Sequence, residues 1–110
     1  MQKKECTQDR SGDRHADKCN VTSNAVGDIW AGGASNARKI YLNKPAGDNG
    51  EERIKIWQSD TIVIDRIVEP GFNEHLLKSE SGRSVKIEVT TTKVGSNGTS
   101  SYYIHLEWFS

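Results

Sequence analysis

The chain has 110 residues, 34% of them hydrophobic, and its fifteen Lys and Arg side chains balance fifteen Asp and Glu. This length fits one domain with a single core, and the zero net charge gives no general attraction to nucleic acid or to an anionic membrane. No apolar run approaches the roughly 18 residues that cross a bilayer. We therefore expect no nucleic-acid partner and no membrane insertion.

The N-terminal part of the chain is polar. Residues 1–24 are mostly charged or small, and they show neither the period of a helix nor that of a strand. The first residues do not form a signal peptide, because no apolar stretch follows them, although a natural signal sequence could have been removed. We expect a polar, weakly structured N-terminal segment over 1–24 and a single domain over 25–110.

Both cysteines, Cys6 and Cys19, belong to this polar segment. Neither lies in a predicted strand, so neither has a core in which to be buried as a thiol. We predict that they form a disulfide, which would contribute about 3 kcal/mol by closing a short loop. The alternative is two free thiols in a cytosolic protein. A metal site needs about four ligands, and His15 is the only other good ligand nearby, so no metal is expected.

Strand signals follow from about residue 25 onward, separated by clusters of turn-forming residues. A short strand is expected around Ile29, since Gly27, Gly32 and Gly33 disfavour a helix there. The segment 72–79 fits one or two helical turns as well as a strand, and we interpret it as a strand that follows a type II turn at Glu69-Pro70-Gly71. The clearest strand patterns cover 38–42, 52–58, 61–68, 84–92 and 101–109.

These elements predict an all-β fold. Six or seven short strands without a convincing helix are typical of an antiparallel two-sheet β-sandwich, immunoglobulin-like or transthyretin-like. The alternating runs 84–92 and 101–109, joined by a loop rich in turn formers, predict a long antiparallel hairpin. The pattern leaves the strand order and the oligomeric state open.

Alternation also predicts which side chains face the core. The inward set is Ile54, Ile56, Val85, Ile87, Val89, Ile104 and Leu106, and the outward set is Trp57, Lys86, Glu88, Tyr103, His105 and Glu107.

Three outward residues, Trp57, Tyr103 and His105, are our candidates for a binding surface. If strand 52–58 lies in the same sheet as the terminal hairpin, they share one solvent-facing surface suited to a sugar ring or to a loop of a protein partner. The alternative is that these side chains only shield the sheet or pack under the N-terminal segment.

Signals for catalysis or cofactor binding are weak. His105 and Glu107 share a face and could act as general acid and base, but no nucleophile, oxyanion donor or metal partner accompanies them. The acidic loop formed by Asp48, Asn49, Glu51 and Glu52 matches no defined calcium-binding spacing. The glycines between residues 27 and 33 lack the remainder of a phosphate-binding motif. We therefore assign no catalytic residue, metal or cofactor.

The best interpretation is a non-enzymatic binding module of the cell exterior or envelope, extracellular or periplasmic, that recognises a protein or glycan partner. One alternative is an intracellular inhibitor or immunity-type protein that blocks an enzyme. Another is a small secreted hydrolase such as a ribonuclease, although the helix that usually packs on the sheet of such enzymes is not evident.

Overall fold

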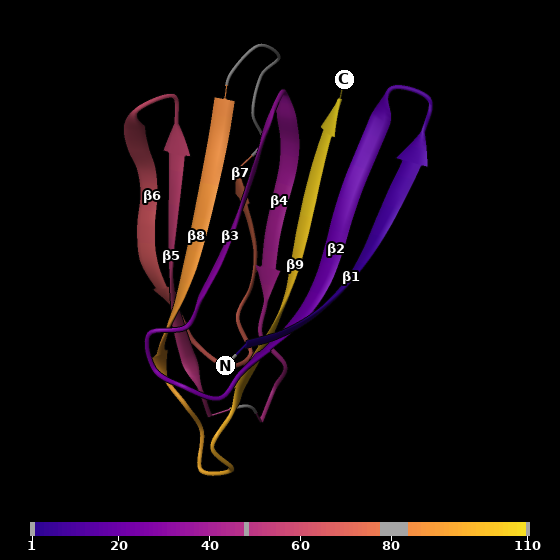
Figure 1. The fold of residues 1–110 in the computed structure, drawn as a ribbon. Helices are drawn as coiled ribbons and strands as arrows, with labels where there is room; N and C mark the ends of the chain where they lie inside the picture. Colours follow the sequence, from indigo (N-terminus) through magenta and orange to yellow (C-terminus); the bar gives the residue numbers. More distant parts are fainter. Residues whose placement is uncertain (1, 48, 78–83, 110) are drawn as a thin grey trace.

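The computed structural model describes residues 2–47, 49–77 and 84–109, and the regular structure in these ranges consists of nine β-strands without a helix (Figure 1). The prediction of an all-β fold is confirmed, with more strands than the six or seven expected. The strands are β1 (Gln2–Ser11), β2 (Arg14–Ser23), β3 (Ile29–Ser35), β4 (Ala37–Asn43), β5 (Glu51–Gln58), β6 (Thr61–Val68), β7 (Asn73–Leu77), β8 (Ser84–Lys93) and β9 (Ser100–Phe109).

The strands form two antiparallel sheets. One sheet has the order β1-β2-β9-β4-β7 and the other the order β3-β8-β5-β6. From β2 to β9 the chain changes sheet at every connection except the one between β5 and β6. This is the strand order of a jelly roll, with β1 added at one edge. The sandwich is therefore confirmed, whereas its strand order differs from that of an immunoglobulin domain.

The expected hairpin between the last two long strands does not form. β8 pairs with β3 and β5, whereas β9 pairs with β2 and β4 in the opposite sheet. The connection over 94–99, orange to yellow at the foot of Figure 1, passes from one sheet to the other. Alternation had indicated correctly that each strand buries one face. It carries no information on which strand provides the hydrogen-bonding neighbour.

The core lies between the two sheets. All seven residues predicted to face inward are buried there, and Ile40 and Leu42 of β4 join them. Trp30 of β3 also belongs to the core, and its ring folds over Gly32, where a β-carbon would lie 2.5 Å from the ring. Where a strand buries one face in this core, its opposite face is left as the surface available to a partner.

The expectation of a weakly structured segment over 1–24 differs from the structure. Residues 2–23 form the β1–β2 hairpin, and β2 also pairs with β9, so that Cys19 and Val21 are part of the core. The strand period is missing from β1 because it is an edge strand whose residues are nearly all exposed. In a strand whose two faces are both exposed to solvent, no burial requires apolar residues to alternate with polar ones.

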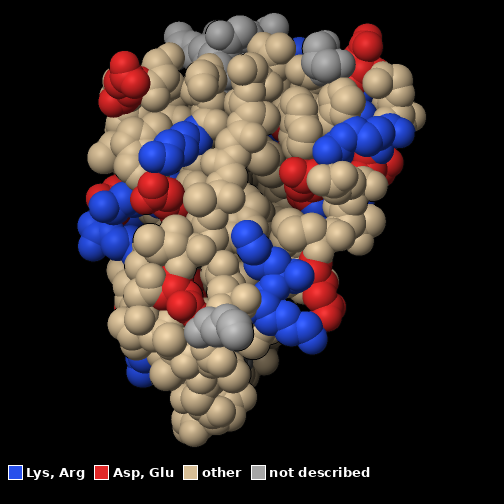
Figure 2. All heavy atoms as spheres, in the orientation of Figure 1, with Lys and Arg blue, Asp and Glu red and all other residues tan. Residues whose placement is uncertain are grey.

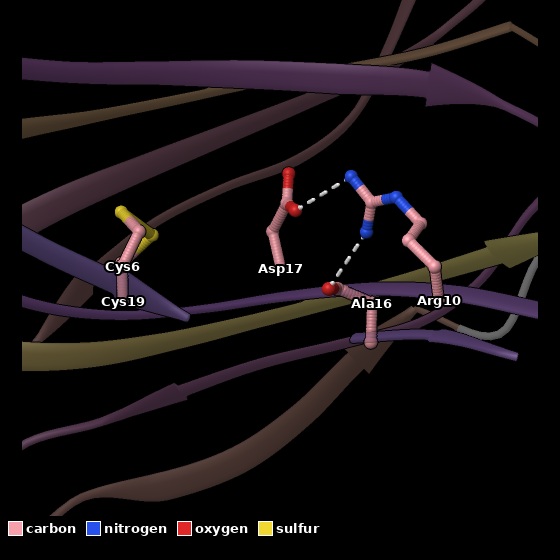
Figure 3. Close-up of a disulfide and its surroundings, with 5 residues drawn as sticks. All are labelled: Cys6, Arg10, Ala16, Asp17 and Cys19. Atoms are coloured by element: carbon pink, nitrogen blue, oxygen red, sulfur yellow. Dashed lines mark hydrogen bonds and ion pairs between the residues drawn. A yellow bond between two sulfur atoms is a disulfide. The ribbon is translucent and has the colours of Figure 1, made fainter. Parts of the chain in front are cut away.

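The predicted disulfide is present. Cys6 and Cys19 are directly opposite in the β1–β2 register and are bonded (Figure 3). The reason differs from the one expected, since both cysteines lie in strands and Cys19 is only 2% exposed. Near the turn of the same hairpin, Arg10 donates to the carbonyl oxygen of Ala16 at 3.0 Å and pairs with Asp17 at 3.3 Å. The disulfide and the Arg10 contacts thus connect the two strands of the hairpin at two places along its length.

Candidate binding site

Six aromatic and polar side chains form two rows across the outer face of the five-stranded sheet. Each row crosses β7, β4 and β9, and the rows lie two residues apart along the strands. We call this array the tyrosine–histidine face; its first row is Asn73, Asn43 and Tyr103, and its second row is His75, Tyr41 and His105.

The pleat of the strands directs these side chains outward. In β4, Ile40 and Leu42 are buried on either side of Tyr41, and in β9 Ile104 and Leu106 are buried on either side of His105. Since successive residues of a strand point to opposite faces, burial of the aliphatic residues places the aromatic ones on the solvent side. The outward orientation predicted for Tyr103 and His105 is confirmed.

Tyr41 lies at the centre of the second row. Its ring centroid is 5.1 Å from that of His75, and 5.7 Å from that of His105, which meets it edge-on at 84°. The ammonium group of Lys39 lies 5.4 Å from the centroid of the same ring. Contacts of this kind hold an aromatic side chain in one orientation.

A chain of polar contacts runs along β9. The Tyr103 hydroxyl lies 3.4 Å from Nδ1 of His105, whose Nε2 lies 3.3 Å from the carboxylate of Glu107. Arg14 of β2 donates to that carboxylate at 3.0 Å.

The protonation states of two members of this chain follow from their surroundings. Burial alone would raise the pKa of Glu107, but the hydrogen bonds from Arg14 and His105 outweigh it, so the pKa falls below its ordinary value. Burial raises the pKa of the Tyr103 phenol. At neutral pH, Glu107 is therefore ionised and Tyr103 keeps its proton.

Five of the six side chains line a surface hollow of about 320 Å³. Its lining residues are Tyr41, Asn43, Asn73, Tyr103 and His105. Ligand sites in proteins begin at about 300 Å³, so this hollow fits a single small ring.

Trp57 does not share this surface, and the prediction that it does is wrong. β5 belongs to the four-stranded sheet, so the outward face of Trp57 is on the other side of the molecule from Tyr103 and His105. Its ring lies under the ammonium group of Lys86, at 5.0 Å. The prediction assumed that strand 52–58 lies in the same sheet as the terminal strand. Sheet membership depends on pairing between strands that are distant in sequence.

Sequence reasoning missed Tyr41, His75, Asn43 and Asn73. Tyr41 alternates with Ile40 and Leu42, so its outward orientation could have been found from the pattern. The pattern could not have shown that β4 lies between β7 and β9, which brings the four side chains beside Tyr103 and His105.

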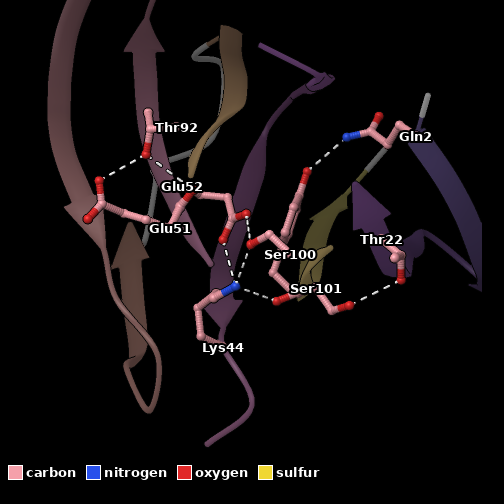
Figure 4. A network of polar contacts seen from close by, with 9 residues as sticks. Gln2, Thr22, Lys44, Glu51, Glu52, Thr92, Ser100 and Ser101 are labelled. Atoms are coloured by element: carbon pink, nitrogen blue, oxygen red, sulfur yellow. Dashed lines mark hydrogen bonds and ion pairs between the residues drawn. The ribbon is translucent and has the colours of Figure 1, made fainter. Parts of the chain in front are cut away.

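A second polar cluster lies at the end of the sandwich where β4 ends and where β5 and β9 begin (Figure 4). Lys44 donates to Ser100 Oγ at 2.9 Å and to the Ser101 carbonyl at 2.7 Å, and it pairs with Glu52 at 2.9 Å. A lysine beside a serine hydroxyl resembles an activated nucleophile. However, Lys44, Glu52 and Ser100 are at most 1% exposed, so no substrate reaches them. A β-carbon on Gly50 would lie 1.9 Å from Ser100 Oγ, which shows how closely the loop covers the cluster.

The acidic loop does not gather its carboxylates. Glu52 is directed into the core, Glu51 accepts a hydrogen bond from Thr92 at 2.9 Å, and Asp48 lies outside the described residues. In the described ranges, no group of three His, Cys, Asp or Glu side chains is placed to hold a metal ion.

Two further surface properties bear on possible partners. Lys and Arg side chains are interspersed with Asp and Glu over the face drawn in Figure 2, so that this view contains no broad field of one sign. No helix within residues 2–47, 49–77 and 84–109 is long and apolar enough to cross a membrane.

The strand order defines a jelly-roll β-sandwich, and the tyrosine–histidine face is a candidate ligand surface on one of its sheets. No protein-family model matches the chain, and no curated protein matches it. One solved structure that it resembles is titled "Structure of infectious bursal disease virus Gx strain", with 13% identity and a TM-score of 0.36. The match covers 100% of this chain and 32% of the other, so this chain spans about a third of that length. A likeness at this TM-score carries no argument about function.

Proposed function

We propose that the protein is a non-enzymatic binding domain of the cell exterior or envelope, which recognises a protein or glycan partner through the tyrosine–histidine face. The proposal rests on the two rows of aromatic and polar side chains, five of which line a hollow on the outer face of the five-stranded sheet. A few polar groups that converge in a small hollow are typical of ligand sites.

The chemistry of the face supports binding more than catalysis. His105 and Glu107 lie 3.3 Å apart, as in a general acid–base pair. An efficient general base has a pKa near the working pH. The pKa of Glu107 is instead lowered, because Arg14 and His105 donate to its carboxylate. Glu107 therefore suits a structural role, in which it orients the His105 ring.

The disulfide supports the proposed location. Disulfides persist in oxidising compartments and are rare in the cytosol. Titration of free thiols in protein isolated from its native source separates this location from that of an intracellular inhibitor. Two titratable thiols per chain would contradict an exterior location.

The test of the binding surface is affinity capture from the native source with three immobilised proteins: wild type, Tyr103→Ala combined with His105→Ala, and Trp57→Ala. We expect the double variant to lose the captured partner and Trp57→Ala, on the opposite outer face, to retain it. Circular dichroism spectra identical to that of the wild type serve as the folding control. A partner retained by the double variant and lost by Trp57→Ala would place the binding surface on the other sheet.

A further inference from the structure

We infer that the tyrosine–histidine face binds one sugar ring of an uncharged glycan in the hollow between Tyr41 and Tyr103. This inference rests on the proposed function and specifies its ligand. The volume of about 320 Å³ suits one ring and its hydroxyl groups better than a longer segment of a partner.

The aromatic members suit the apolar side of a sugar. The C–H groups of a pyranose ring form a flat apolar patch, which packs on an aromatic face. Tyr41 is held between His75 and His105, with ring centroids 5.1 and 5.7 Å away. A side chain already held in place loses little conformational entropy when a ligand packs on it.

The polar members suit the hydroxyl groups. A sugar hydroxyl both donates and accepts hydrogen bonds, and so do the amides of Asn43 and Asn73. The two amides are directly opposite in the β4–β7 register, and Asn43 is opposite Tyr103 in the β4–β9 register. The three side chains therefore form a continuous polar row along one side of the hollow, and none of them carries a charge at neutral pH.

The distribution of apolar surface favours a glycan over a protein partner. Protein interfaces of ordinary size cover about 800 Å² on each side and have an apolar centre. The large hydrophobic side chains exposed in the described residues lie away from this face, in β6, at the start of β3 and in the preceding loop: Val26, Ile29, Ile62, Val63 and Ile67.

The first test applies fluorescently labelled protein to an array of immobilised neutral and acidic oligosaccharides of defined structure. Titrations with the best neutral oligosaccharide follow, for wild type and four variants: Tyr41→Ala, Tyr41→Phe, Asn73→Ala and Trp57→Ala. We expect Tyr41→Ala and Asn73→Ala each to weaken binding by about tenfold, which corresponds to the loss of one stacking contact or one hydrogen bond. Tyr41→Phe, which keeps the ring, should recover most of the affinity lost in Tyr41→Ala. Trp57→Ala, on the other sheet, should bind like the wild type.

Three outcomes would overturn the inference. The first is glycan binding that survives Tyr41→Ala and Asn73→Ala unchanged. The second is preference for acidic oligosaccharides, since the charge would then make the main contact. The third is that the protein binds none of the immobilised oligosaccharides, while Tyr103→Ala with His105→Ala abolishes capture of a protein. The proposed binding domain would then stand, with a protein as its partner. The proposed function itself fails if variants of this face change no binding to glycan or protein.

Discussion

The ammonium group of Lys44 is shielded from water and depends on oxygen atoms of Glu52, Ser100 and Ser101. A buried charge is tolerated only where its partners replace the lost hydration. The carboxylate of Glu52 depends on Lys44 in the same way and also accepts a hydrogen bond from Ser100. The cluster therefore links β5, β9 and the loop after β4.

Replacing Lys44 alone should be costly. We expect Lys44→Met to lower the free energy of unfolding by about 3–5 kcal/mol, because it leaves the Glu52 carboxylate buried without its cation. Lys44→Met combined with Glu52→Leu should recover most of that loss, since an apolar pair of similar volume is often neutral. Urea denaturation of both variants measures the difference. Equal stability of the single variant and wild type would show that water reaches this cluster.

The stability that Glu107 contributes depends on pH. Glu107 has a pKa below its ordinary value of 4.5 in the folded protein, so its ionised form is favoured by folding. The resulting stabilisation is fully present above pH 4.5 and is lost as the pH falls through the folded-state pKa. We expect Glu107→Gln to lower the melting temperature at neutral pH and to match the wild type at the acidic end of the range. Thermal unfolding followed across this range measures the change, and a pH-independent difference would contradict the assignment.

At the scale of elements, the β1–β2 hairpin is attached asymmetrically. β2 lies between β1 and β9, whereas β1 pairs only with β2 and forms the edge of its sheet. Edge strands lose their hydrogen bonds more readily than central ones. The disulfide and the contacts of Arg10 therefore stabilise the position of β1 more than that of any other strand.

Removing the disulfide should release β1 first. We expect Cys6→Ala with Cys19→Ala to lower the free energy of unfolding by about 3 kcal/mol. Hydrogen exchange should accelerate in β1 and remain slow in the central strands β5 and β8. Arg10→Ala, which affects the same hairpin and leaves the disulfide intact, is the matched control. A uniform loss of protection across both sheets would show that the disulfide stabilises the whole sandwich equally.

On the scale of the whole molecule, the sandwich separates its two outer faces. Trp57 with Lys86 lies on the four-stranded sheet, and Tyr103 with His105 lies on the five-stranded sheet. The core between the sheets is filled by side chains from both. A change on one outer face should therefore reach the other only through that core.

This separation predicts additive effects on stability. For Trp57→Ala and Tyr103→Ala, the change in free energy of unfolding of the double variant should equal the sum of the single changes within about 0.5 kcal/mol. Tyr41→Ala and His75→Ala, whose rings are 5.1 Å apart, should instead couple by about 0.5 kcal/mol or more. Double-mutant cycles in urea measure both pairs. Strong coupling between Trp57 and Tyr103 would contradict the two-sheet arrangement.

Local features of this protein could be predicted from the sequence alone. Alternation placed Ile104 and Leu106 inward and Tyr103 and His105 outward, as the structure has them. The turn at Glu69-Pro70-Gly71 was also readable: Gly71 has a φ of 82°, and the Phe72 amide donates to the Glu69 carbonyl at 3.1 Å. These features depend on residues close together in the chain, through backbone conformation and through the period of two that burial of one face imposes.

The identity of neighbouring strands, in contrast, became known from the tertiary structure. It separated Trp57 from Tyr103, placed β8 and β9 in different sheets, and brought Tyr41 and His75 beside His105. It also ordered residues 2–23 as two strands, although β1 has no buried face to impose a pattern. Strands pair through main-chain hydrogen bonds, which are the same for nearly every residue, so the side chains of one segment do not specify its partner. That choice follows from how the whole set of apolar faces packs into one core.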